Sequence, residues 1–496
     1  MKSLIRYITL IVAVVTACTV SAQSLKLANV LQSNMVIQQN KPLKLWGWGV
    51  AGDKVTIEAD WQYEPINTQV DAQGNWLAKI NVPAAIPGHK YVHQIYIIHN
   101  KDTIKLNNLL IGDVWFCIGQ SNMDMPVGEI KPWTYYGVLD FEKEIAAANF
   151  PNIRIYRSDW QFRAEPSTDN KGQWKECSPT SVRNFSAVAY FFGRKLYQQL
   201  NIPIGIVVSA IPGASTQAFA SRGVLEGDTM LKRVYLDPVQ KLISTQKKVD
   251  SLGLFSAVTK PTLIYNSIIY PMLNLSVKGI IFYQGESNIT DKRENYIPLF
   301  TAMVANLRSQ MKQGELPFYY TQIAPYREEH DDTTAYKAAI FKETQEKLLS
   351  IKNIGIAVTM DVGEERNVHP RDKKPVGERL AAIALSKTYH KRTPYLGPHM
   401  AKFEVDGNQV TLYFRKGTIG SGLTTKDGKA PQHFFVAGDD HKFYWATAKI
   451  AGDNVILSSD KVSKPIAVRY AFTNGAVTNF ENKEGLPAMP FRTDDW

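Results

Sequence analysis

An apolar run that ends abruptly in a glycine and a serine is the feature that most constrains the fold of this chain. The run covers residues 109–118 and leads directly into the motif Gly119-Gln120-Ser121-Asn122-Met123. Strands buried in a parallel sheet show such near-continuous hydrophobicity, and ligands bind at the carboxyl edge of these sheets. The glycine permits a tight turn, which makes Ser121 a candidate nucleophile at that edge. The alternative role for Ser121 is to cap the helix that follows.

Apolar strand patterns and helical patterns alternate through the middle of the chain. Strands are expected at residues 111–118, 204–209, 277–284, 318–323 and 354–361. Helical periodicity is found at residues 185–196, 296–307, 335–349 and 376–385. This alternation is typical of βαβ units, so we predict an α/β fold with a doubly wound parallel sheet of five strands. Residues 215–262 are long and mixed, and we expect a helical insertion that walls the cleft.

Short strand patterns separated by turns occupy both flanks of this region. They cover residues 42–46, 55–58, 76–80 and 94–98 on one side, and residues 410–414, 433–436, 455–458 and 466–470 on the other. The motif Gly47-Trp-Gly-Val-Ala-Gly52 matches a dinucleotide-binding pattern, but a strand follows it instead of a helix. We therefore predict β-rich regions at residues 23–108 and 401–496 around a domain at residues 109–400. Whether the two β-rich regions form one unit is left open.

Two further motifs accompany the first one. They are Tyr283-Gln-Gly-Glu-Ser-Asn288 and His369-Pro370, which is followed by Lys373, Gly377, Glu378, Arg379 and Leu380. In this order the three motifs resemble the sialate O-acetylesterase family of SGNH-type hydrolases, which also includes some acetylxylan esterases. The resemblance covers nearly the whole mature chain and implies the five-stranded SGNH-like sheet. It also implies a serine esterase that uses neither a metal nor a cofactor. The first expected substrate is O-acetylated sialic acid, and acetylxylan or another acetylated glycan is the second.

Ester hydrolysis by this class of enzyme needs a nucleophile, a base and oxyanion donors. His369 is the expected base for Ser121, because it follows the last parallel strand and lies at the same sheet edge. The backbone N–H groups of Ser121 and Gly213 and the side-chain amide of Gln284 are the expected oxyanion donors. Turn formation for Gly213 and a buried structural amide for Gln284 are the alternatives. Gln120 is a possible supporting residue.

The acid that orients His369 is the least defined part of the predicted site. Many SGNH enzymes carry Asp three residues before the histidine, where this chain has Arg366. Asp361, at the end of the fifth strand, is the first choice. Glu286, Glu364 and Glu365 are further candidates, as is a Ser–His dyad held by a backbone carbonyl. Glu286 and Glu365 could also support the loops, and Lys373 and Arg379 are expected to anchor the His369 loop or to meet a substrate carboxylate.

The first 22 residues have the pattern of a signal peptide, with a charged start, an apolar core and a small-residue cleavage site before Gln23. The apolar run is too short to span a bilayer. We expect an exported protein, periplasmic or extracellular, and lipid anchoring at Cys18 is the alternative. Few cysteines remain and no C-x-x-C or zinc spacing occurs, so we expect neither a disulfide framework nor a metal site.

The formal net charge of +11 suits an anionic partner, but no run of five or more Lys or Arg residues occurs. Nucleic acid is therefore not an expected partner, whereas an acidic sugar is compatible. Two other classes stay open: a glycan-binding protein on a degenerate hydrolase scaffold, and a glycosidase that uses Asp361 and Glu286 as its two carboxylates. The sequence does not indicate an oligomeric state.

Overall fold

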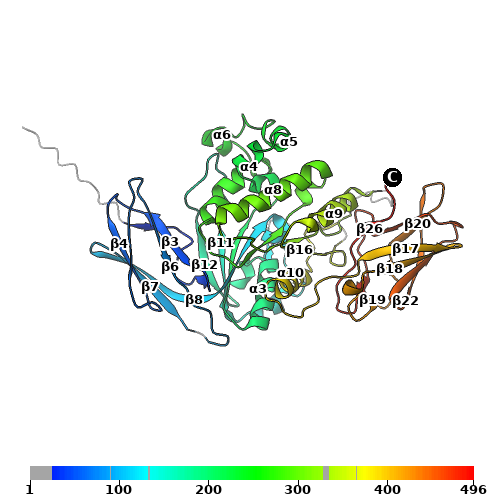
Figure 1. The fold of residues 1–496 in the computed structure, drawn as a ribbon, viewed down its shortest axis with the longest axis horizontal. Coiled ribbons are helices and arrows are strands. Elements are labelled where there is room, and N and C mark those ends of the chain that lie inside the picture. The colour runs from blue at the N-terminus through cyan, green and yellow to red at the C-terminus, as the bar shows by residue number, and fades with distance from the viewer. Residues whose placement is uncertain (1–24, 90, 132–134, 328–334, 365) are drawn as a thin grey trace, which may run out of the picture.

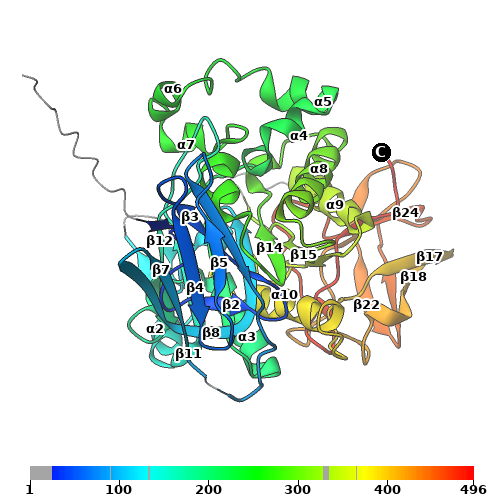
Figure 2. The ribbon, with the colours of Figure 1, turned by 60° about the vertical axis from the view of Figure 1, so that its left-hand side comes forward.

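The structure is a computed structural model, and it describes residues 25–89, 91–131, 135–327, 335–364 and 366–496. A central α/β region lies between two β units, which occupy opposite ends of the molecule (Figure 1). The view in Figure 2 also keeps the two β units apart. The predicted signal peptide and Cys18 lie outside the described residues.

The central sheet has the strand order β12-β11-β13-β8-β14-β15-β16. All neighbours in this order pair in parallel except β12, which pairs antiparallel with β11 at the edge. The strands are β8 (Asp102–Gly119), β11 (Phe150–Ser158), β12 (Gly172–Cys177), β13 (Ile204–Ala210), β14 (Gly279–Tyr283), β15 (Phe318–Thr321) and β16 (Ile354–Ala357).

Helices cover both faces of this sheet because successive strand residues point to opposite sides. Along β8, Trp115 and Cys117 pack with residues of α3 and α10, whereas Phe116 and Ile118 pack in the cluster that holds residues of α8 and α9. The main helices are α3 (Ala187–Leu200), α8 (Arg293–Met311), α9 (Lys337–Lys347) and α10 (Lys374–Lys387). The short helices are α1 (Ser121–Asp124), α2 (Phe141–Ala146), α4 (Arg222–Glu226), α5 (Thr229–Leu231), α6 (Gln246–Asp250) and α7 (Leu254–Ala257).

The N-terminal β unit is built on the first half of the long strand β8. There β8 pairs antiparallel with β7, and its next segment pairs in parallel with β2. The strands of this unit are β1 (Lys26–Leu27), β2 (Val36–Gln38), β3 (Leu43–Trp48), β4 (Lys54–Ala59), β5 (Ile66–Gln69), β6 (Asn75–Ile80) and β7 (His93–His99). The predicted boundary after residue 108 thus falls inside one continuous strand, which pairs with strands of the N-terminal β unit and with strands of the central sheet.

The C-terminal β unit has its own antiparallel sheets, with strand orders β17-β18-β23-β22, β19-β25 and β21-β20-β24-β26. Its strands are β17 (Met400–Asp406), β18 (Gln409–Phe414), β19 (Leu423–Thr425), β20 (Phe434–Ala437), β21 (Phe443–Trp445), β22 (Thr447–Ala451), β23 (Asn454–Ser458), β24 (Ala467–Tyr470), β25 (Phe480–Asn482) and β26 (Phe491–Arg492). The remaining two strands, β9 (Glu129–Ile130) and β10 (Tyr135–Tyr136), form a separate ribbon beside the central sheet.

The five predicted parallel strands all form, but the count of five is wrong. β11 is a sixth parallel strand, and Asn152, Arg154 and Arg157 interrupt its apolar residues, so it does not form an apolar run. Arg154 is nevertheless buried, where it donates to the backbone oxygen of Asn108 and lies 3.3 Å from the carboxylate of Glu176. Because such pairing makes a buried arginine tolerable, the hydrophobic pattern alone does not reveal this strand.

Candidate active site

Four loops at the carboxyl edge of the central sheet carry the predicted site residues. Ser121 follows β8, Gly213 follows β13 and Gln284 follows β14, whereas His369 lies between β16 and α10. At Gly119, a Cβ atom would lie 2.2 Å from the backbone oxygen of Tyr283, and the φ angle is +150°. Only glycine permits this close approach of β8 and β14, so the glycine of the first motif is required by packing.

Ser121 is the first residue of α1, and Gln120 occupies the N-cap position before it. The alternative of a capping serine is therefore not what the fold shows. Within the described residues, the backbone N–H of Ser121 has no acceptor. The Gln120 side chain supports the site, since its oxygen accepts from the backbone N–H groups of Gly285 and Ser287 at 3.3 and 3.4 Å.

The segment that carries His369 is attached to the segment that carries Ser121. Asn122 donates through Nδ2 to the backbone oxygen of Val368 at 3.0 Å. The ring of Tyr135 lies edge-on to the His369 imidazole at a centroid distance of 5.0 Å, and its hydroxyl donates to the backbone oxygen of Ser121 at 3.4 Å. The residues adjacent to the candidate nucleophile and to the candidate base are thus held by shared contacts.

A buried polar network lies directly behind these two segments. The Asn122 amide also donates to Glu286 at 2.6 Å, and its oxygen accepts from the Lys373 ammonium group at 2.5 Å. Burial lowers the pKa of Lys373 to about 7. Burial also raises the pKa of Glu286, against the opposing effects of hydrogen bonding and the nearby lysine. Lys373 therefore anchors the His369 loop, which is one of its two predicted roles, and Glu286 supports the same loops.

The backbone at Gly213 is consistent with its predicted role as an oxyanion donor. Its φ angle is +76°, a conformation that favours glycine, and its N–H has no acceptor in the described part of the chain. Ser287 Oγ donates to the Gly213 carbonyl at 2.9 Å and so holds the loop at the peptide that follows this N–H. An N–H that is not used within the protein, in a loop at the same sheet edge as Ser121, is available to serve as an oxyanion donor.

Gln284 is held in a different way from the one predicted. Its side-chain nitrogen donates to the Ala214 backbone oxygen at 3.1 Å and to Asn288 Oδ1 at 2.7 Å. Its oxygen accepts from the Thr216 hydroxyl. Since an amide nitrogen carries two hydrogens, both are already used. The geometry thus favours the structural alternative for Gln284, a buried amide that ties the end of β14 to the Gly213 loop.

The carboxylate of Asp361 is occupied by an arginine. Arg379 Nη1 donates to Asp361 Oδ1 at 2.6 Å and Arg379 Nη2 donates to Oδ2 at 2.7 Å. This buried bidentate pair gives both oxygens of Asp361 a structural partner, so it favours a role in the ion pair over the predicted role as the acid that orients His369. It also shows Arg379 in its predicted anchoring role.

Another candidate acid, Glu364, lies in the same loop as Asp361 and His369. Glu364 accepts from Asn367 Nδ2 at 2.6 Å and from the backbone N–H of Arg371 at 2.9 Å, so it closes a turn. Glu365 lies outside the described residues. Asn122, Tyr135 and Asp124 were not predicted as functional residues. Asn122 lies within the serine motif and Asp124 directly follows it. The motif is therefore the signal that could have pointed to both residues.

No group of three His, Cys, Asp or Glu residues in the described ranges could hold a metal ion. Among the same residues, no helix is long and apolar enough to cross a membrane. Cys117 and Cys177 are both buried, and neither forms a disulfide.

The α/β layers and this edge of the sheet are those of a carbohydrate esterase. The family model for carbohydrate esterases described as sialic acid-specific acetylesterases matches residues 111–386, and the chain belongs to that family. Sialate O-acetylesterases from Rattus norvegicus and Homo sapiens are each 25% identical, over 94% of this chain and 94% and 92% of theirs. A solved carbohydrate acetylesterase from Xanthomonas citri is 31% identical with a TM-score of 0.82, over 95% of this chain and 100% of that one.

Proposed function

We propose that this site removes O-acetyl groups from sugars through an acetyl-enzyme on Ser121, in the manner of SGNH-type hydrolases. The observation that carries the proposal is the Asn122 bridge, which attaches the Ser121 segment to the His369 segment. A serine hydroxyl is a weak nucleophile at neutral pH and needs an adjacent base of this kind.

In the first step, Ser121 Oγ forms a bond to the acetyl carbon while its proton passes to His369. The bond to the sugar oxygen then breaks, and the sugar leaves as an alcohol with the proton from His369. Water attacks the acetyl-enzyme with His369 again as base, which releases acetate and restores the serine. The N–H groups of Ser121 and Gly213 stabilise the oxyanion in both steps.

O-acetylated sialic acid is the substrate that the family match and the rat and human relatives support best. Acetylated xylan or another acetylated glycan is the second candidate, supported by the wider naming of the Xanthomonas citri structure as a carbohydrate acetylesterase. A glycosidase is disfavoured, because Asp361 is bound to Arg379 and Glu286 is bound to Asn122.

Acetate release from O-acetylated N-acetylneuraminic acid and from acetylated xylan tests the reaction and the substrate together. Ser121→Ala and His369→Ala should each abolish release while the unfolding transition stays that of the native protein. A fluorophosphonate probe should label the native protein and not Ser121→Ala. A glycan-binding protein on a degenerate scaffold would not react with the probe, and an active Ser121→Ala variant would exclude the proposed nucleophile.

We also propose that residues 1–22 direct export and are removed. The sequence pattern of a charged start, an apolar core and a small-residue cleavage site supports this proposal. Mass spectrometry of the mature product separates the alternatives. A chain that begins at Gln23 supports the soluble form, and a lipid-modified chain that begins at Cys18 supports the anchored form.

A further inference from the structure

The carboxylate of Asp124 is buried close to the candidate nucleophile and takes no part in the proposed reaction steps. Asp124 is the last residue of α1, the short helix that begins at Ser121, and only 1% of its surface is exposed. Arg157 Nη2 donates to Asp124 Oδ1 at 2.7 Å. No donor in the described part of the chain has hydrogen-bond geometry with the other oxygen, Oδ2. A buried carboxylate oxygen without a donor is destabilising, so its presence beside the site needs a reason.

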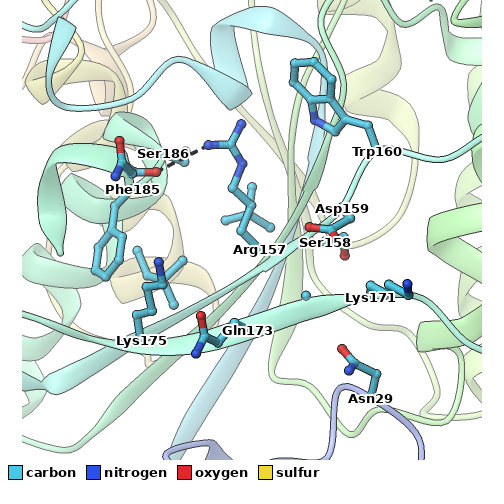
Figure 3. Close-up of a pocket in the computed structure, with 14 residues that line it drawn as sticks. Asn29, Arg157, Ser158, Asp159, Trp160, Lys171, Gln173, Lys175, Phe185 and Ser186 are labelled. Carbon is cyan, nitrogen blue, oxygen red and sulfur yellow. Dashed lines mark hydrogen bonds between the residues drawn. The ribbon is translucent and has the colours of Figure 1, made fainter. Parts of the chain in front are cut away.

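Arg157 holds Asp124 from the edge of the central sheet. It lies on β11, the parallel strand that the apolar pattern did not predict. Its side chain extends toward Phe185 and Ser186, the residues just before α3 (Figure 3), and Nη1 donates to the backbone oxygen of Asn184 at 3.4 Å. The guanidinium group is thus bonded to two segments. Because 34% of the Arg157 side chain is exposed, water can solvate its charge even where Asp124 does not.

Tyr135 connects Asp124 to the candidate base. The Tyr135 ring lies edge-on to the His369 imidazole, at a centroid distance of 5.0 Å and an interplanar angle of 74°. Its hydroxyl donates to the backbone oxygen of Ser121 at 3.4 Å, which is long for a bond between two oxygens. Burial raises the pKa of this hydroxyl, and the negative charge of Asp124 raises it further. The hydroxyl therefore keeps its proton, and the Asp124 carboxylate attracts it.

The charge of Asp124 is kept at a cost to stability. Burial raises the pKa of its carboxyl to about 6, against the lowering effects of Arg157 and Tyr135. The ordinary value is 3.8, and between these two values the native protein binds more protons than the unfolded chain. Stability therefore falls as the pH rises through this window, and above it the whole cost is present. A residue retained at such a cost beside a candidate active site is expected to serve function instead of folding.

We propose that Asp124 is a positioning residue of the esterase, which acts on the His369 imidazole through the ring of Tyr135. Arg157 fixes the carboxylate, the carboxylate holds the Tyr135 hydroxyl, and the Tyr135 ring restricts the rotation of the imidazole. A base held in one orientation reaches the reactive geometry more often. Asn122 holds the backbone of the same loop, whereas this set of residues holds the side chain of the base. The role rests on the proposed esterase function and adds to it.

Kinetics with an acetyl ester reporter and denaturant unfolding, both at pH 8, test this role in the full-length protein. Asp124→Asn removes the charge and keeps the shape of the side chain. It should lower kcat by about tenfold while KM stays within about twofold, because a displaced base slows the chemical step without changing where the ester binds. Stability should equal that of the native protein or exceed it, since the cost of the buried charge is removed. Lower stability with unchanged kcat would show a purely structural ion pair and would overturn the proposal.

Tyr135→Phe keeps the ring and removes the hydroxyl, so it tests the connection between the carboxylate and the base. It should lower kcat by a similar factor. The double variant of Asp124→Asn with Tyr135→Phe should lose little more than the larger of the two single losses, since both changes break the same contact. Losses that multiply in the double variant would overturn the connection through Tyr135, as would a native kcat in Tyr135→Phe.

Asp494→Asn is the matched control. Asp494 is also buried and pairs with Arg469 at 2.6 Å, but it lies on the C-terminal β unit. The control should lower stability and leave kcat unchanged, and a loss of kcat equal to that of Asp124→Asn would count against the proposal. Fluorophosphonate labelling of the native protein reports on the esterase site separately. A native protein that is neither labelled nor active on the reporter would contradict the proposed function, whereas an active native protein with equally active variants would contradict only the positioning role.

Discussion

The side chain of Asn122 holds the backbone of Val368 through a hydrogen bond of 3.0 Å from Nδ2 to the carbonyl oxygen. Asn122 directly follows the candidate nucleophile, Ser121, and Val368 directly precedes the candidate base, His369. A single side chain therefore connects two loops that are far apart in the sequence. Lys373 and Glu286 in turn hold the Asn122 amide in the orientation that this contact needs.

Asn122→Ala should lower kcat by about 100-fold, because a displacement of about 1 Å between reacting groups costs about that much. The acetyl carbonyl would still reach Ser121, so KM should change much less than kcat. Steady-state kinetics with an acetyl ester reporter measure both constants. Asn408→Ala is the matched control, since Asn408 is exposed in the turn between β17 and β18. Unchanged kcat in Asn122→Ala would show that the bridge does not position the site.

The sequence predicted the parts of this site that depend on strand order alone. Parallel strands present their carboxyl ends at one edge, so Ser121, Gly213 and His369 could be placed there from the pattern of apolar runs. The bridging role of Asn122 could not be predicted in the same way. It depends on which polar atoms lie near each other in the packed structure, and the periodicity of apolar residues does not predict this.

Gly213→Ala should lower kcat by about tenfold or more while the protein stays folded. An alanine at φ +76° is strained by about 1–3 kcal/mol, and its Cβ would lie 3.3 Å from Val258 Cγ2. The peptide would relax by turning, which would move its N–H away from the developing oxyanion. Gly223→Ala is the control, since that glycine lies in α4 and a Cβ there would meet nothing within 4 Å. Equal kcat values for the two variants would contradict the oxyanion role of Gly213.

Lys373→Met should change how stability depends on pH. The native pKa of Lys373 is about 7, below its ordinary value of 10.5, so between these values the unfolded chain binds more protons than the native one. Stability then rises with pH in that window, and Lys373 contributes about 2 kcal/mol of the rise between pH 7 and pH 9. The Met variant should lack this part of the rise.

Denaturant unfolding at pH 7 and pH 9 measures this difference. The matched control is Lys374→Met, because Lys374 is the adjacent residue and is exposed. Its stability should follow the native pH dependence. If Lys373→Met also kept the native dependence, the lysine would titrate normally and its burial would not affect its proton affinity.

The role of Asp361 shows the limit of a prediction from strand order. An aspartate at the end of the last parallel strand stands at the correct edge for an acid that orients His369. Its partner is Arg379, which lies 18 residues later on α10, and both groups are buried, where an unpaired charge would be strongly destabilising. Both residues are present in the sequence, but the sequence alone does not predict whether Asp361 contacts Arg379 or His369.

Asp361→Asn separates the two roles of this residue. If the carboxylate serves the ion pair, the variant should lose about 3–5 kcal/mol of stability, because Arg379 would remain buried without its counter-charge. The kcat of the protein that remains folded should stay within a few-fold of the native value. Asp237→Asn provides the comparison, since Asp237 pairs with Lys232 at 3.0 Å on the exposed surface and should cost at most about 1 kcal/mol. Chemical denaturation gives the stabilities, and kcat is measured below the unfolding transition. A loss of kcat by about 10⁴ with unchanged stability would instead assign Asp361 to the orientation of His369.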